Sequence, residues 1–66
     1  MLELDLLLNN FVDQNFKTLS QQHRQSFELL LSYPDQTLLD LLLGNSVSSD
    51  AEIANVVGLI RATPFN

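Results

Sequence analysis

The residue types that carry most enzyme chemistry are sparse in this chain. It has one histidine, His23, and no cysteine. A catalytic histidine needs a nucleophile to deprotonate or a carboxylate to orient it, and no motif marks either partner for His23. Because thiolate ligands are absent, His23 could bind zinc only with the help of carboxylates. We therefore expect His23 to be a partly exposed structural residue.

The acidic residues are not spaced for shared chemistry either. Glu3 and Asp5 are two positions apart, so on a helix their side chains diverge and cannot share a proton or a metal ion. Asp35 and Asp40 do not face each other. The sequence also lacks a glycine-rich phosphate loop, a nucleophile elbow and a paired metal-ligand motif. These observations predict a protein that is not an enzyme by itself and that has no catalytic or metal site.

Length and charge restrict the functions that remain. The 66 residues allow a single domain, residues 1–66, whose core is small. Such a core leaves little room for a ligand pocket, and we expect no bound cofactor. Eight acidic and three basic residues give a net charge of −5, which repels nucleic acid and anionic lipid headgroups. We therefore expect neither nucleic-acid binding nor insertion into a membrane.

Three breaks divide the sequence into four helical segments, and no run alternates as a strand does. The first helix is expected at about residues 1–16. Ser20 suits an N-cap, which places the second helix at about residues 21–31. Pro34 interrupts the chain because it has no N–H to donate, and Asp35 can cap the helix that follows.

The third helix is expected at about residues 36–43. Gly44 then provides a left-handed C-terminal stop. Ser49 and Glu52 have the spacing of a capping box, so the last helix should begin after Ser49 and end before Pro64.

Apolar stripes on these helices predict an all-α fold, a small antiparallel bundle of about four helices. The predicted core residues are Leu4, Leu7, Leu8, Phe11, Val12, Phe16, Leu19, Phe27, Leu30, Leu31, Leu38, Leu39, Leu41, Leu42, Leu43, Ile53, Val56, Val57 and Ile60. Leu2 and Leu6 break the pattern because they fall on the polar face beside Glu3. Another segment or a partner covers them, or they are ordinary exposed leucines. Gly58 either permits a close helix contact or is simply tolerated.

The order of these segments resembles the succinate dehydrogenase assembly factors that promote flavin attachment. This family comprises the bacterial FAD assembly factors and mitochondrial succinate dehydrogenase assembly factor 2. The stretches that carry the resemblance are MLELD, FKTLSQQHRQSFELLLSYPDQTLLDLLLG and DAEIANVVGLIR. The family signature is Arg-Gly-x-x-Glu, and Glu3 would be its glutamate. Its Arg, its Gly and the family's first helix would precede Met1, and leucines stand where the third helix usually has a tryptophan.

The resemblance implies a chaperone-like, non-catalytic role. Family members bind the flavoprotein subunit of succinate dehydrogenase or fumarate reductase and promote its covalent attachment of FAD. Such a factor can act by favouring the client conformation that is competent for the reaction. FAD would then be the client's cofactor. The implied location is the bacterial cytoplasm, or the mitochondrial matrix in a eukaryote.

On this resemblance, Glu3 belongs to the partner-binding surface, where it would accept charge-assisted hydrogen bonds. Leu6, Asn10 and Asp13 share its face of the helix, and Leu2 borders it. The alternative is that Glu3 is a solvated residue favoured near a helix N-terminus. Without the family's first helix, Leu2 and Leu6 would be exposed and would favour self-association into a homo-oligomer.

Two other functions remain open from the sequence. One is an antitoxin-like or adaptor module that regulates a different protein. The other is a fragment of an enzyme whose partner supplies the nucleophile or the metal.

Overall fold

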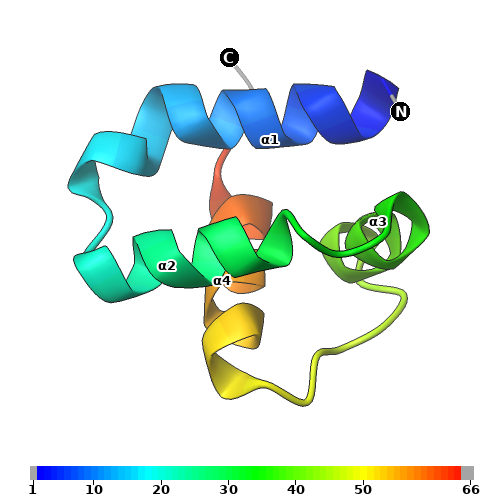
Figure 1. Cartoon of the computed structure of the whole chain (residues 1–66). Coiled ribbons are helices and arrows are strands. Elements are labelled where there is room, and N and C mark those ends of the chain that lie inside the picture. Colours follow the sequence, from blue (N-terminus) through cyan, green and yellow to red (C-terminus); the bar gives the residue numbers. More distant parts are fainter. Residues whose placement is uncertain (1, 65–66) are drawn as a thin grey trace.

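The computed structural model describes residues 2–64, which form four α-helices and one short 3-10 helix. In chain order these are α1 (Leu2–Asn15), η1 (Phe16–Thr18), α2 (Gln21–Leu30), α3 (Asp35–Leu43) and α4 (Ala51–Ala62). Figure 1 shows α1 antiparallel to α2, α4 crossing behind α2, and α3 near the start of α1. The predicted all-α fold is confirmed, and the predicted helix ends lie close to the observed ones.

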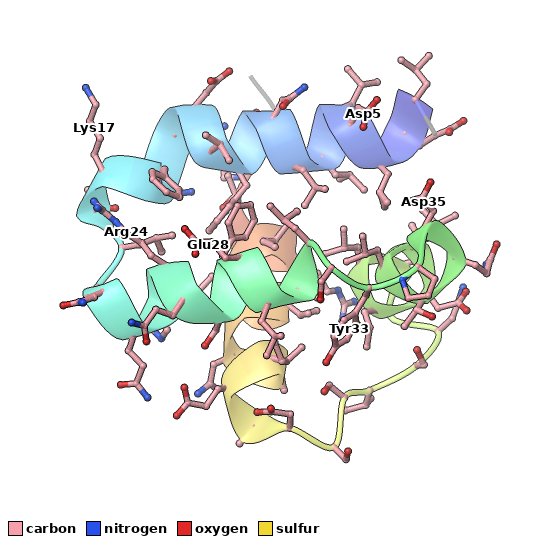
Figure 2. The ribbon with its side chains drawn as sticks, viewed as in Figure 1. Asp5, Lys17, Arg24, Glu28, Tyr33 and Asp35 are labelled. Atoms are coloured by element: carbon pink, nitrogen blue, oxygen red, sulfur yellow. The ribbon has the colours of Figure 1, made fainter. Side chains whose placement is uncertain are left out.

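The first two helices are separated where the sequence predicted a break. The Ser20 hydroxyl accepts a hydrogen bond from the backbone N–H of His23 at 3.1 Å, which confirms the predicted N-cap. Across this break, the guanidinium of Arg24 on α2 lies 5.0 Å from the centre of the Phe16 ring in η1. Arg24 Nη2 also donates to the carbonyl of Lys17 at 3.3 Å. Arg24 therefore holds η1 against the start of α2 (Figure 2).

Two predicted caps differ from the structure. Asp35 is the first residue of α3, and Pro34 precedes it as an N-cap with no side-chain bond. The carboxylate of Asp35 then only complements the helix dipole from the first turn. On α4, Asp50 replaces Ser49 as the N-cap, because Asp50 Oδ1 accepts from the N–H groups of Glu52 at 2.9 Å and Ile53 at 3.4 Å.

Apolar side chains from all four α-helices form the core. The buried apolar residues are Leu4, Phe11, Phe27, Leu30, Leu38, Leu41, Leu42, Ile53, Val56, Val57 and Ile60. The rings of Phe11 and Phe27 connect α1 to α2 at a centroid separation of 5.4 Å. Each large side chain buried in this way contributes roughly 1.5–3 kcal/mol. The core therefore fixes the inner face of α1, which determines the direction of its outer face.

Three predicted core residues are exposed instead. Val12 is turned about 100° from the fully buried Phe11 and retains 38% of its accessible surface. Leu31 and Leu43 lie at the C-terminal ends of α2 and α3, where the stripe is no longer covered, and both are exposed. By contrast, the polar residue Ser26 on α2 is buried, and its hydroxyl donates to Glu52 Oε2 at 3.4 Å.

The two glycines have different roles. Gly44 follows α3 with a φ of +82°, which confirms the predicted left-handed stop. The guanidinium of Arg61 lies directly over it, because a Cβ placed on Gly44 would be 2.8 Å from Arg61 Nη2. A Cβ placed on Gly58 would meet nothing within 4 Å. Gly58 is therefore tolerated and does not mediate a close helix contact.

Candidate docking surface

The outer face of α1 contains most of the residues predicted to bind a partner. Leu2 retains 71% of its accessible surface and Leu6 retains 54%. Glu3 and Asp13 are exposed on the same helix. Within residues 2–64, no segment covers these two leucines, so the structure leaves them available to another molecule.

The charge on α1 has one sign. The helix carries Glu3, Asp5 and Asp13 and no basic residue. Lys17 comes only after it, in η1, and Figure 2 shows Asp5 and Lys17 toward opposite ends of this part of the molecule. The exposed leucines therefore lie among carboxylates, which suits a partner surface that combines basic groups with an apolar recess.

Asn10 has a role inside the chain that the sequence did not indicate. Its side chain is half-buried, and Nδ2 donates to the carbonyl of Pro64 at 3.1 Å. Gln14 Nε2 donates to the same carbonyl at 2.7 Å and to Asn10 Oδ1 at 2.8 Å. The Asn10 amide is thus engaged with the segment after α4, unlike the side chains of Glu3 and Asp13.

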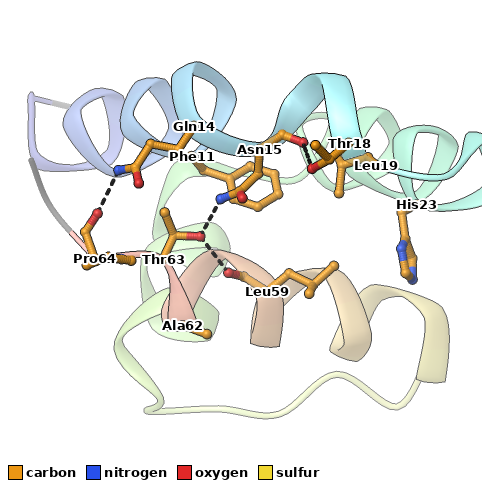
Figure 3. A pocket seen from close by; sticks show the side chains of 10 residues that line it. All are labelled: Phe11, Gln14, Asn15, Thr18, Leu19, His23, Leu59, Ala62, Thr63 and Pro64. Atoms are coloured by element: carbon orange, nitrogen blue, oxygen red, sulfur yellow. Dashed lines mark hydrogen bonds between the residues drawn. The ribbon is translucent and has the colours of Figure 1, made fainter.

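A third amide on α1 contacts the same segment. Asn15 Nδ2 donates to Thr63 Oγ1 at 2.8 Å, and that hydroxyl donates to the carbonyl of Leu59 at 2.9 Å (Figure 3). We call Asn10, Gln14 and Asn15 the amide clamp. Its only signal in the sequence was the i, i+4 spacing of Asn10 and Gln14, and such pairs are common on solvated helices.

A groove of about 380 Å³ lies between α1 and α4 beside the amide clamp (Figure 3). Its lining residues are Phe11, Gln14, Asn15, Thr18, Leu19, His23, Leu59, Ala62, Thr63 and Pro64. His23 is half-buried at this groove, which agrees with its predicted partial exposure. Among residues 2–64, the lining includes no carboxylate, lysine, arginine or cysteine, so this part of the chain offers His23 neither an orienting acid nor a strong nucleophile at the groove.

The described residues lack two features that would point to other kinds of site. Within residues 2–64, no group of three potential metal-ligating side chains is close enough to hold an ion. No helix in the same range has the length and apolar character that a bilayer crossing requires.

The described residues form a small helical domain whose outer helix carries carboxylates and two exposed leucines. Comparison with known proteins identifies the family. The model of the family described as flavinator of succinate dehydrogenase matches residues 1–64. This chain belongs to that family, which confirms the resemblance seen in its sequence.

Several bacterial relatives are named FAD assembly factor SdhE. The relative from Coxiella burnetii is 36% identical over 61 residues, which cover 92% of this chain and 74% of the relative. The relative from Wigglesworthia glossinidia brevipalpis is 35% identical over all 66 residues and 79% of its own length. The relative from Colwellia psychrerythraea is 40% identical over 91% of this chain and 66% of its own length. No solved structure matches the chain significantly.

Proposed function

We propose that this chain is a non-catalytic assembly factor that binds the flavoprotein subunit of succinate dehydrogenase or fumarate reductase and promotes covalent attachment of FAD. The observation that carries this proposal is the family match over residues 1–64. The fold supports it, because the exposed residues Leu2, Glu3 and Leu6 are presented by a helix whose opposite side is locked into the core.

The outer face of α1 supplies the binding energy in this proposal. Leu2 and Leu6 lose water when the partner covers them, at about 25 cal/mol per Å² of apolar surface. Glu3 accepts hydrogen bonds from arginine, lysine or backbone N–H groups of the client, and charge-assisted bonds of this kind are among the stronger ones. Asp13 adds attraction at the rim, which affects the association rate more than the affinity.

Binding can accelerate the client's own reaction without any catalytic group here. If this chain binds the competent client conformer more tightly than the other conformers, it raises the population of that conformer. A tenfold preference corresponds to about 1.4 kcal/mol of differential binding energy. One helix face can supply this difference, because its backbone is already folded before binding and only its exposed side chains must be ordered.

Reconstituted flavin attachment tests this function. Purified apo-flavoprotein is incubated with FAD and with this chain, and covalent flavin is followed by in-gel fluorescence. We expect faster attachment with the wild-type chain and a rate lowered about tenfold by Glu3→Ala at subsaturating concentration. Glu28→Ala, an exposed carboxylate on α2, is the matched control and should behave as wild type. Absence of both binding and acceleration by the wild-type chain would refute the proposal.

A further inference from the structure

Thr63 and Pro64, which follow α4, contact α1 although they add no buried apolar side chain to the core. α4 ends at Ala62, and its last buried residue is Ile60. Thr63 is half-buried and Pro64 is exposed, so neither completes the apolar core. Nevertheless, the amide clamp holds both residues with three side-chain hydrogen bonds, at 2.7, 2.8 and 3.1 Å.

The clamp fixes where Pro64 lies. Asn10 is one helical turn beyond Leu6, and its amide contacts the carbonyl of Pro64. Figure 1 shows the end of the described chain meeting the middle of α1. The exposed proline is therefore next to the face that carries Leu6.

Pro64 is unusually easy to cover with a partner. A proline has no N–H group, so it cannot leave an unpaired donor when water is removed. Its carbonyl already accepts two hydrogen bonds, from Asn10 and from Gln14. Dehydrating this residue therefore costs no backbone hydrogen bond, and its ring is rigid before binding.

We infer that Thr63 and Pro64 form a second part of the docking surface for the flavoprotein subunit, with Asn10 and Gln14 as positioning residues. The inference rests on the proposed function, because the occupant is the same client. The surface becomes continuous across two segments that are far apart in the sequence. Asn10 then contributes to docking by holding Pro64 in place, and it need not touch the client itself.

Site-specific photo-crosslinking tests this contact directly. Chains carrying benzoylphenylalanine at position 6, 64 or 47 are irradiated with the flavoprotein subunit. Position 47 is the control, because Val47 is 86% exposed and belongs to the α3–α4 loop on the side of the bundle away from α1 (Figure 1). We expect adducts from positions 6 and 64 but not from 47. An adduct from 6 without one from 64, or equal adducts from 64 and 47, would overturn the inference. Absence of adducts from all three positions would instead count against the proposed function.

A second pair of variants separates positioning from folding. Gln14→Ala removes the shortest clamp bond together with the bond to Asn10, whereas Gln25→Ala removes the same amide group from an exposed position on α2. We expect Gln14→Ala to weaken binding to the flavoprotein about fivefold to tenfold while both variants melt at similar temperatures. Equal affinities for the two variants, or a loss of affinity matched by loss of fold, would contradict a positioning role.

Discussion

Two leucines two positions apart on α1 should lose very different amounts of stability from the same substitution. Leu4 retains 3% of its accessible surface and Leu6 retains 54%. Leu4→Ala leaves a cavity in the core and should cost about 2–5 kcal/mol of unfolding free energy. A domain of this size has roughly 3–10 kcal/mol in total, so this variant should be largely destabilised. Partner binding would then be lost with the fold.

Leu6→Ala should change stability much less. Burying a whole leucine contributes about 1.5–3 kcal/mol, and only about half of this side chain is covered. Alanine also has the higher helix propensity, which offsets part of the loss. We expect a net cost of about 0.5–1 kcal/mol. The affinity for the flavoprotein should nevertheless decrease, because the truncated side chain lies in the docking surface.

Urea unfolding followed by far-UV circular dichroism measures both changes on one scale. The two variants remove the same atoms from the same helix, so each is the control for the other. Equal losses of unfolding free energy would refute the assignment of inner and outer faces of α1.

Three further predictions concern backbone and surface. Gly58→Ala should stabilise the chain by about 1 kcal/mol, seen as a thermal midpoint about 4–8 °C higher, because its added Cβ meets nothing within 4 Å. A lower midpoint would show that Gly58 has a packing role. Gly44→Ala should lower the unfolding free energy by about 1–2 kcal/mol, because φ is +82° and Arg61 must move. Unchanged stability in urea would contradict this. Exposed Leu2 and Leu6 should cause self-association, visible by sedimentation at two concentrations and reduced by Leu6→Glu. A monomer at both concentrations would argue against it.

The sequence predicted best where an apolar stripe is regular and covered along its length. On α4, Ile53, Val56, Val57 and Ile60 are all buried as their spacing requires. The same reasoning failed at helix ends, where Leu31 and Leu43 continue a stripe beyond the elements that could cover it. Periodicity reports the direction of a side chain but not whether another element lies there.

The helix caps and the candidate site show a second limit of prediction from sequence. Ser49 and Asp50 are adjacent residues that can both cap a helix, and their types alone do not decide between them. The structure selects Asp50, whose own N–H donates to Ser48 Oγ at 3.1 Å. The exposed outer face of α1 could be predicted, because Leu2 and Leu6 depart from the stripe. The amide clamp could not, since its bonds join residues separated by 48 to 54 positions.

The role of the outer face of α1 is tested most directly by the affinity of the chain for the purified flavoprotein subunit, measured by titration calorimetry with wild type and Leu6→Ala. We expect a complex with the wild-type chain and about tenfold weaker binding by the variant, with both chains folded under the assay conditions. No complex with the wild-type chain, or equal affinities for the two, would contradict the claim that the outer face of α1 binds the flavoprotein subunit.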